Sequence, residues 1–219
     1  MPDKFVDPYI DPATGVLRNL VGARTYDDLA RAEGELASLR MGELIEHGDF
    51  HPSGTLDDFC HIHHALFQDI YEWAGRIRTV EIRKNVDGAE FFLPSTNIAM
   101  GIEWSRSELI KDNMLKGLGL SSFVERLAYH YDNYNFVHPF REGNGRTQRV
   151  FWTLLCHDAG YDLDWRLASG EENDEASRLA AEDRDYSLLI SMFSRIVTPC
   201  DPLVPINQEL VAANHLHDR

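Results

Sequence analysis

The sequence predicts an all-α domain, a helical bundle that carries one small β-hairpin flap. Apolar residues recur at intervals of three and four along most of the chain of 219 residues, as they do in amphipathic helices. Only residues 79–93 combine β-forming residues with a central Asp-Gly turn. We divide the chain into an arm over residues 1–24, a helical domain over residues 25–197 and a tail over residues 198–219.

Composition limits the classes of protein to which the chain can belong. Its hydrophobic content of 43% is ordinary for a folded soluble protein, and no apolar run reaches the roughly 18 residues of a membrane span. The N-terminal segment lacks the apolar core of a secretory signal, so we expect a cytoplasmic protein. Three cysteines without a CxxC pair argue against a disulfide framework or a cysteine zinc site. A net charge of −15 argues against direct binding of nucleic acid.

Two helices are expected before the hairpin. The first starts at Thr25, a residue suited to the N-cap, and stops near Gly48. The second spans about Thr55 to Trp73, and Gly75 ends it. The side chains expected on the buried face of the first helix are those of Leu29, Ala32, Leu36 and Leu39.

The hairpin at residues 79–93 has extended runs on either side of Asp87-Gly88. A single hairpin is only marginally stable in water. We therefore expect it to lie against the helical body as a flap.

Four helices are expected after the hairpin. They cover about 96–111, a stretch from Ser121 to about Asn135, a stretch from about Asn144 to Gly160, and 174–196, after which prolines prevent continuation. The second of these has a capping-box pattern, Ser122 with Glu125. Its apolar stripe is formed by Phe123, Leu127, Tyr131 and Tyr134.

The segment HPFREGNGRTQR, residues 138–149, falls in the loop before the third of these helices. A helix N-terminus offers free N–H groups and a partial positive charge. Gly143 and Gly145 permit a close approach of the backbone to a ligand, and Asn144 can cap the helix or donate an amide hydrogen bond. The segment therefore predicts an anion-binding cradle built mainly from backbone donors.

The side chains of the segment add chemistry to this cradle. Arg146 and Arg149 lie three residues apart on one helix face and suit two neighbouring phosphates. Glu142 beside an anion site indicates a Mg²⁺ ion between carboxylate and phosphate. His138 is suited to act as general base on a hydroxyl nucleophile. Together they predict group transfer from a nucleotide polyphosphate.

The same segment matches the motif HxFx(D/E)GNGRxxR of the Fic family at every specified position. The stretches HHALFQDIYEWAGRIRTVEIRK and FVERLAYHYDNYNFVHPF, and the opening YIDPATGVLRN, also resemble the family. The resemblance covers about residues 9–197, so the helical domain is identified as a Fic domain. It implies the Fic fold, a helical bundle with a β-hairpin flap.

Fic enzymes typically transfer AMP from ATP to a Ser, Thr or Tyr hydroxyl of a target protein and release pyrophosphate. The resemblance implies that His138 is the base and that Glu142 holds Mg²⁺. It implies that Phe140 anchors the loop in the core, that Arg146 binds the β-phosphate and that Arg149 binds the γ-phosphate. The residues implied to line the anion hole are Gly143, Asn144 and Gly145.

The resemblance also assigns roles to the flap and to one glycine. The flap would align a target segment by strand addition. The flap side chains implied to dock the target are Val80, Ile82, Lys84 and Phe92. Some relatives with lysine in place of Gly145 transfer the γ-phosphate, so the glycine favours AMP transfer.

Many Fic proteins carry an inhibitory helix with the pattern (S/T)xxxE(G/N), whose glutamate pairs with the second arginine of the motif. None of the three Glu-Gly or Glu-Asn pairs here has Ser or Thr four residues earlier: Glu33 follows Leu29, for example. The chain thus resembles toxin-type members that are inhibited by a separate small antitoxin carrying this helix. Its wider resemblance is to bacterial Fic toxins that modify DNA gyrase and topoisomerase IV.

Three alternatives stay open at this point. The chain could transfer another phosphate-linked group (UMP, phosphate or phosphocholine) or bind a nucleotide without turnover. It could also be a metal hydrolase that uses the histidines of the HIHH run at residues 61–64, although no HExxH spacing is present. The mass added to a modified target separates the transferases, and bound zinc in the purified protein would favour the hydrolase.

Overall fold

The computed structural model describes residues 6–47, 50–83 and 91–207. Helices dominate the described residues and only a small two-stranded sheet accompanies them, which confirms the predicted fold class. The helices are α1 (Tyr26–His47), α2 (Leu56–Phe67), α3 (Ile98–Lys111), α4 (Leu120–Val137), α5 (Asn144–Asp158), α6 (Gly170–Asp183) and α7 (Ser187–Ile196). Short 3-10 turns occupy Ser95–Asn97, Asn113–Leu115 and Trp165–Leu167.

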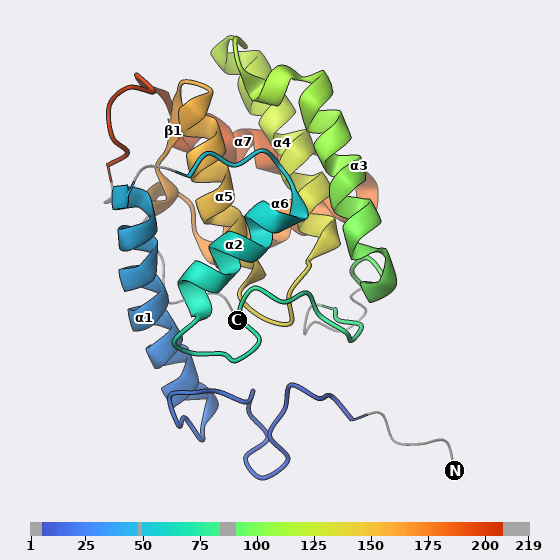
Figure 1. Cartoon of the computed structure of the whole chain (residues 1–219). Coiled ribbons are helices and arrows are strands. Elements are labelled where there is room, and N and C mark those ends of the chain that lie inside the picture. The colour runs from blue at the N-terminus through green and yellow to red at the C-terminus, as the bar shows by residue number, and fades with distance from the viewer. Residues whose placement is uncertain (1–5, 48–49, 84–90, 208–219) are drawn as a thin grey trace.

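The centre of the bundle is formed by α2, α4 and α5 (Figure 1). The ring of Phe59 from α2 stacks on Tyr134 of α4 at 5.3 Å between centroids and meets Phe151 of α5 at 4.5 Å. All three side chains are buried. The outer helices complete the bundle, because α1 packs on α2 while α3 and α7 pack on α4. Within the described residues, none of the helices combines the length and apolar character that crossing a lipid bilayer requires.

The first helix begins where the sequence predicts, but its buried face is rotated from the predicted one. The Thr25 hydroxyl accepts a hydrogen bond from the Asp28 amide, as an N-cap residue does. Leu29 is buried as expected, whereas Leu39 is 60% exposed. Leu39 lies about 80° around the helix axis from Leu29. Glu33, one turn after Leu29, is buried instead.

Three helix boundaries differ from the prediction. Helix α2 ends at Phe67 instead of Trp73, because the chain turns there and packs the Trp73 ring on Tyr71 at 4.1 Å. Helix α4 starts from Gly119 without a side-chain cap, so the predicted capping box does not form. The final predicted helix is two helices, α6 and α7, separated at Arg184, whose φ of +57° is left-handed.

The β structure has one predicted and one unpredicted part. The flap shows an antiparallel bridge between Arg83 and Phe91, and the Phe92 amide donates to the Ile82 carbonyl at 3.1 Å. The predicted Asp87-Gly88 turn lies outside the described residues. The unpredicted sheet pairs β1 (Tyr161–Leu163) with β2 (Val197–Pro199) in antiparallel register.

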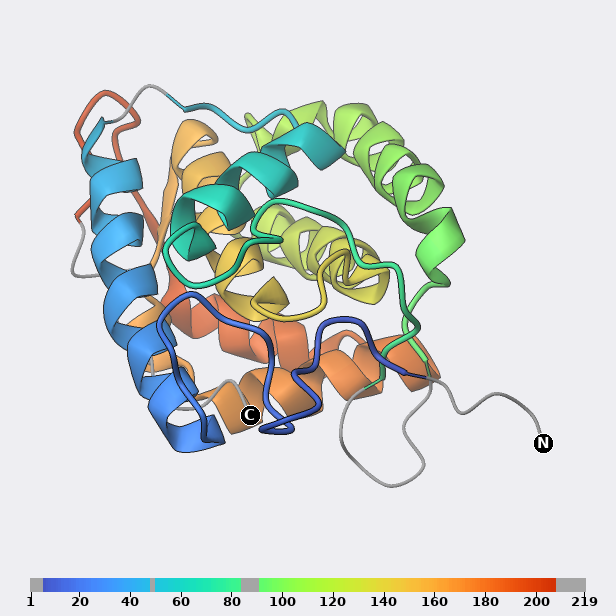
Figure 2. The ribbon, with the colours of Figure 1, turned by 60° about the horizontal axis from the view of Figure 1, so that its bottom comes forward.

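The N-terminal arm runs across the end of the bundle where α5 begins (Figure 2). Its Leu20 amide donates to the Ile70 carbonyl at 2.8 Å, and the Tyr9 ring meets Trp73 edge-on. Asp7 pairs with Arg141 at 2.9 Å. The arm therefore contacts the motif segment directly. Its division from the helical domain at residue 24 stays a prediction.

Candidate active site

The motif segment forms the connection between α4 and α5. His138 ends α4 in a left-handed conformation with φ of +45°. Gly143 precedes α5 as its N-cap, with φ of +80° and no side-chain cap. Residues 138–143 are therefore a short loop that joins two helix ends, as the sequence predicts, and the loop delivers the N-terminus of α5 to the site.

His138 is held on two sides. Its Nδ1 lies 2.9 Å from the Asn135 carbonyl oxygen, which can only accept, so Nδ1 carries the proton and donates it. The basic lone pair is consequently on Nε2. The Phe92 ring of the flap stacks on the imidazole at 3.7 Å with an interplanar angle of 8°. The ring orientation of His138 is thus fixed by α4 and by the flap together.

Arg78, which the sequence analysis did not single out, joins the flap to the motif loop. Its side chain is buried, and burial lowers its pKa. The guanidinium donates to the carbonyl of His138 at 2.8 Å, to that of Val80 at 2.8 Å and to that of Leu93. Its backbone amide donates to the Pro139 carbonyl at 2.8 Å. One cation therefore fixes the backbone around the histidine.

The interior of the loop is fastened by Phe140, Asn144 and His63. The Asn144 amide side chain accepts from the Phe140 N–H and donates to the Phe140 carbonyl, both at 2.8 Å. Its side chain therefore closes the loop by bonding to the loop backbone. The Phe140 ring is fully buried, as predicted for an anchor, and stacks on His63 at 3.9 Å.

His63 belongs to the HIHH run on α2, but it supports the loop. Its Nδ1 accepts a hydrogen bond from the Gly75 amide at 2.8 Å, so the proton is on Nε2, which donates to the Glu142 carbonyl at 3.1 Å. Burial lowers the pKa of this imidazole to about 3. A neutral histidine with a fixed tautomer thus positions the backbone of Glu142.

Gly143 is required for both conformation and space. Its φ of +80° is costly for any residue with a side chain. A Cβ atom there would also lie 2.5 Å from two ring atoms of Phe67. The close packing of the loop on Phe67 sets the place at which the N–H groups of α5 begin.

Arg146 is held by Glu33 and by the ring of Phe67. Its guanidinium pairs with Glu33 of α1 at 2.6 Å, and both side chains are about nine-tenths buried. It also lies over the Phe67 ring, 4.8 Å from the centroid. The Tyr71 hydroxyl donates to the other oxygen of Glu33. Glu33 is thus a site residue that the sequence did not predict, because Leu29, four residues earlier, does not fit the inhibitory pattern and no other local pattern marks Glu33.

Glu142, Gly145 and Arg149 complete the motif. The Glu142 carboxylate accepts from the Gly143 amide at 2.9 Å and lies 3.7 Å from Arg146. Gly145 and Arg149 are half-buried on the first turns of α5. The structure therefore brings the predicted phosphate-site residues together on one loop and one helix end.

The predicted flap residues occupy different environments. Val80 is buried, and its carbonyl accepts from Arg78. Ile82 is half-buried, and Phe92 faces His138. Lys84 lies outside the described residues. Contact of these residues with a target protein stays a prediction.

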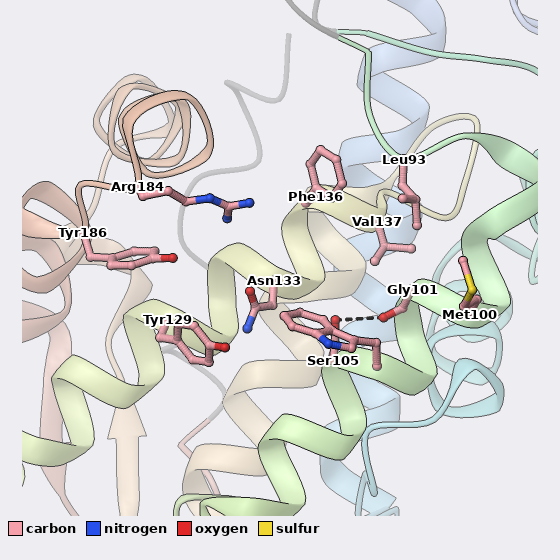
Figure 3. A pocket seen from close by; sticks show the side chains of 11 residues that line it. Leu93, Met100, Gly101, Ser105, Tyr129, Asn133, Phe136, Val137, Arg184 and Tyr186 are labelled. Atoms are coloured by element: carbon pink, nitrogen blue, oxygen red, sulfur yellow. Dashed lines mark hydrogen bonds between the residues drawn. The ribbon is translucent and has the colours of Figure 1, made fainter.

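A pocket of about 530 Å³ opens beside the base of the flap, over α4 (Figure 3). Leu93 and Met100 lie on one side of it, and Arg184 and Tyr186 lie on the other. Asn133 lines its floor, and among the described residues the buried Nδ2 of this side chain has no hydrogen-bond partner. Such a concave apolar site with a few polar groups is typical of small-molecule binding.

A helix N-terminus with paired arginines, a carboxylate and an oriented imidazole is an arrangement suited to phosphate groups. The Fic/DOC family model matches residues 53–156, which include the loop and most of α5. A Salmonella typhimurium protein named "Probable protein adenylyltransferase Fic" is 36% identical over 206 residues, covering 90% of this chain and 97% of that one. The chain belongs to the Fic/DOC family, and the resemblance seen in the sequence is confirmed.

Other relatives agree with this assignment. The protein adenylyltransferase VbhT of Bartonella schoenbuchensis is 40% identical over 173 residues, 78% of this chain but only 35% of that protein. The N-terminal Fic domain of an effector from Bartonella quintana, solved with bound ADP, has a TM-score of 0.77 at 25% identity and covers 88% of this chain and 95% of that one. The BepC protein of Bartonella tribocorum, at 24% identity and a TM-score of 0.78 over 88% of this chain and 97% of that one, shows the shared fold.

Proposed function

We propose that this chain is a protein adenylyltransferase, which transfers AMP from ATP to a Ser, Thr or Tyr hydroxyl of a target protein and releases pyrophosphate. The observation that carries the proposal is the intact motif loop, which places His138 at one helix end and the N-terminus of α5 at the other. Relatives that share about a third of its residues are named protein adenylyltransferases.

In the proposed reaction, Nε2 of His138 accepts the proton of the target hydroxyl. The Nδ1–H bond to the Asn135 carbonyl supports this role, because it leaves Nε2 as the basic nitrogen. The hydroxyl oxygen then attacks the α-phosphorus of ATP, and the bond from that phosphorus to the bridging oxygen of pyrophosphate breaks. The stack of Phe92 on the imidazole keeps the base oriented during this step.

The phosphates are proposed to bind against the first turn of α5. Its initial N–H groups have no carbonyl partner within the helix and carry the positive end of the helix dipole. Arg146 would contact the β-phosphate and Arg149 the γ-phosphate, one turn further along. Gly145 leaves room for the chain to approach the anion and favours AMP as the transferred group.

Glu142 is the residue we propose to hold Mg²⁺. Its carboxylate is 36% exposed beside the phosphate cradle, and a single carboxylate with phosphate oxygens is the ligand set that Mg²⁺ often takes. The ion would supply compensation for the negative charge of the polyphosphate. The protein's own contribution is the position of Glu142, set through the bond from His63 to its carbonyl.

The pocket over α4 is the place we propose for the adenine base. Leu93, on its wall, follows the Phe92 that stacks on His138, so the pocket adjoins the reacting centre. Asn133 offers an amide that can pair with a purine edge, and Trp104 offers an aromatic face. Asn133→Leu should weaken AMP binding in calorimetry, and unchanged AMP affinity would place the base elsewhere.

The flap is proposed to register the target by strand addition, with Val80, Ile82, Lys84 and Phe92 near the docked segment. The antiparallel bridge at the flap supports an extended edge there. Because strand addition uses backbone hydrogen bonds, the flap could dock targets of many different sequences. Mass spectrometry of a tryptic digest of the modified target identifies the modified residue and the segment around it. A modified residue far from any extended segment would contradict strand addition.

We also propose that the chain is the cytoplasmic toxin of a toxin–antitoxin pair, with DNA gyrase or topoisomerase IV as target. The support is the absence of the pattern (S/T)xxxE(G/N) from this sequence. A separate antitoxin would place a glutamate against Arg149. Inhibition by a candidate antitoxin should be weakened in Arg149→Ala, and full inhibition of that variant would contradict the pairing.

The transfer itself is tested with purified protein, Mg²⁺ and bacterial lysate. ATP labelled at the α-phosphate should label a protein band, whereas ATP labelled at the γ-phosphate should not. The variant His138→Ala should produce no labelled band with either nucleotide, although it should still bind ATP. Label from the γ-phosphate would indicate phosphate transfer instead. ATP binding without any labelled band would indicate a nucleotide-binding module.

A further inference from the structure

A second cluster of reactive side chains lies at the opposite end of α5 from the phosphate site. In the described part of the chain, one group of His, Cys, Asp and Glu side chains is close enough to hold a metal ion: His157, Asp162 and Cys200. Their candidate ligand atoms all lie within 4.8 Å of one another. Helix α5 separates this cluster from the motif loop by about 20 Å.

Local structure explains why these residues meet. His157 is in the last turn of α5, and its carbonyl accepts from Gly160, where the chain reverses with φ of +91°. Strand β1 follows at once and carries Asp162. Pairing with β2 sets Asp162 opposite Thr198, and the Cys200 amide then donates to the Gly160 carbonyl at 2.9 Å. Backbone hydrogen bonds therefore deliver the cysteine to the histidine.

The geometry of the cluster converges on one atom. Nδ1 of His157 lies 2.7 Å from an oxygen of Asp162 and 3.5 Å from the sulfur of Cys200. The histidine is 7% exposed, and the other two side chains are half-buried. A nucleophilic triad would need the thiol and the carboxylate on different ring nitrogens, one to accept and one to orient. Here both meet the same nitrogen, so that relay cannot form.

A metal cation between these three side chains would bind the Cys200 sulfur as a thiolate and compensate the Asp162 carboxylate.

We propose that His157, Asp162 and Cys200 form a divalent transition-metal site, with Zn²⁺ as the ion that the ligands fit best. Imidazole nitrogen, carboxylate oxygen and thiolate sulfur are its usual protein ligands, and three of them leave one position of a tetrahedron for water. Binding would release the Cys200 proton to the solvent and replace the hydrogen bond between Nδ1 and Asp162, with the imidazole proton moving to Nε2 of the same ring. The ligands come from α5, from β1 and from the residue that follows β2, which is why no CxxC spacing marks the site.

The site would tie the segment after β2 to the end of α5. Because ligands from positions 157 and 200 are rarely preassembled in an unfolded chain, metal binding should raise the stability of the fold. The proposal does not depend on the nucleotide site at the other helix end. Its failure would leave AMP transfer untouched, and the reverse also holds.

Cobalt titration of the full-length, tag-free chain tests the site, with Co²⁺ as a spectroscopic probe and Zn²⁺ as competitor. After removal of metal, the wild type should bind one equivalent of Co²⁺ with a thiolate-to-cobalt charge-transfer band, and Zn²⁺ should displace it. Cys200→Ser should lose the band, and His157→Ala should weaken binding by more than about 100-fold. Cys60→Ser is the matched control, because Cys60 lies on α2, outside the cluster.

The melting temperature provides a second readout that does not depend on a colour change. Zn²⁺ should raise it in the wild type and in Cys60→Ser, and should leave it unchanged in Cys200→Ser. Absence of the thiolate band in the wild type would overturn the proposal. So would a Cys200→Ser variant that binds Co²⁺ and responds to Zn²⁺ as the wild type does.

Discussion

Three buried polar side chains outside the motif hold the motif in place. Glu33 pairs with Arg146, His63 donates to the Glu142 carbonyl, and Arg78 donates to the His138 carbonyl. Each comes from a different segment of the chain. Buried polar groups that are fully hydrogen-bonded fix one backbone arrangement, whereas the loss of one partner leaves the other unsatisfied. Substitutions at these three residues should therefore have larger effects than substitutions at exposed residues nearby.

Glu33 should contribute to the affinity for nucleotides that carry a β-phosphate, because it orients Arg146. In Glu33→Ala we expect ADP to bind about tenfold more weakly, the equivalent of one charged hydrogen bond, with AMP affinity unchanged. Glu33→Gln, which keeps a hydrogen bond but removes the negative charge, should bind ADP at least as tightly as the wild type. Isothermal titration calorimetry with both nucleotides measures this.

The exposed Glu35 on the same helix supplies the control, and Glu35→Ala should leave both affinities unchanged. An equal fall of ADP and AMP affinity in Glu33→Ala would mean that Glu33 only stabilises the fold. The selective role would then be wrong.

Arg78 should contribute strongly to stability. Arg78→Met would leave the carbonyls of His138, Val80 and Leu93 without their donor. Each unsatisfied buried group costs about 1–3 kcal/mol, so we expect the free energy of unfolding to fall by about 3 kcal/mol or more. Urea denaturation measures the loss. Arg76→Met, at an exposed position, should change little, and equal stability of the two variants would contradict the role of Arg78.

His63 should make stability depend on pH in the acid range. Its pKa is about 3 in the folded chain against 6.5 for an unperturbed histidine, so below pH 6.5 the unfolded state binds more protons. Its contribution to stability is complete above pH 6.5 and is lost as the pH falls toward 3, by up to about 1.4 kcal/mol per pH unit.

Denaturant unfolding at several pH values tests this dependence. His63→Asn should show a shallower decline of stability with falling pH than the wild type. The variant of the exposed His61, His61→Asn, should keep the wild-type slope. Identical slopes for all three proteins would show that the buried imidazole does not titrate as described.

At the scale of elements, the start of α5 depends on how closely the loop packs on α2. Gly143→Ala should lower stability and nucleotide affinity, because it combines a left-handed φ with a Cβ 2.5 Å from Phe67. Gly117→Ala separates the two causes, since Gly117 has the same φ of +80° and nothing within 4 Å of its Cβ position. The cost of the Gly117 variant should be about 1–2 kcal/mol, and that of Gly143 clearly larger. Equal melting temperatures would contradict the packing argument.

Local sequence predicts some boundaries of the elements but not others. Thr25 marks the start of α1 because a cap is a local interaction, and the glycines marked the loop before α5 for the same reason. The break between α6 and α7 was not predicted, because Arg184 adopts a left-handed conformation that is uncommon for arginine. The β1–β2 sheet was missed because its strands are three residues long and far apart in sequence.

For the whole molecule, the motif identified the family and predicted the reacting groups, but the contacts that support the motif are long-range. Glu33 and Arg146 meet across 113 positions of the sequence, and His63 and Glu142 across 79. No periodicity or spacing encodes such pairs, since they depend on how α1 and α2 pack on α5. The net charge of −15 likewise does not indicate that the motif arginines lie at one end of the bundle.

The most direct test of the account is a crystal structure of His138→Ala with a non-hydrolysable ATP analogue and Mg²⁺. We predict electron density for the triphosphate against the first turn of α5, with Arg146 on the β-phosphate and the ion beside Glu142. Density for the base should fill the pocket over α4. A nucleotide bound elsewhere on the molecule, with the α5 N-terminus free of phosphate, would contradict the central claim.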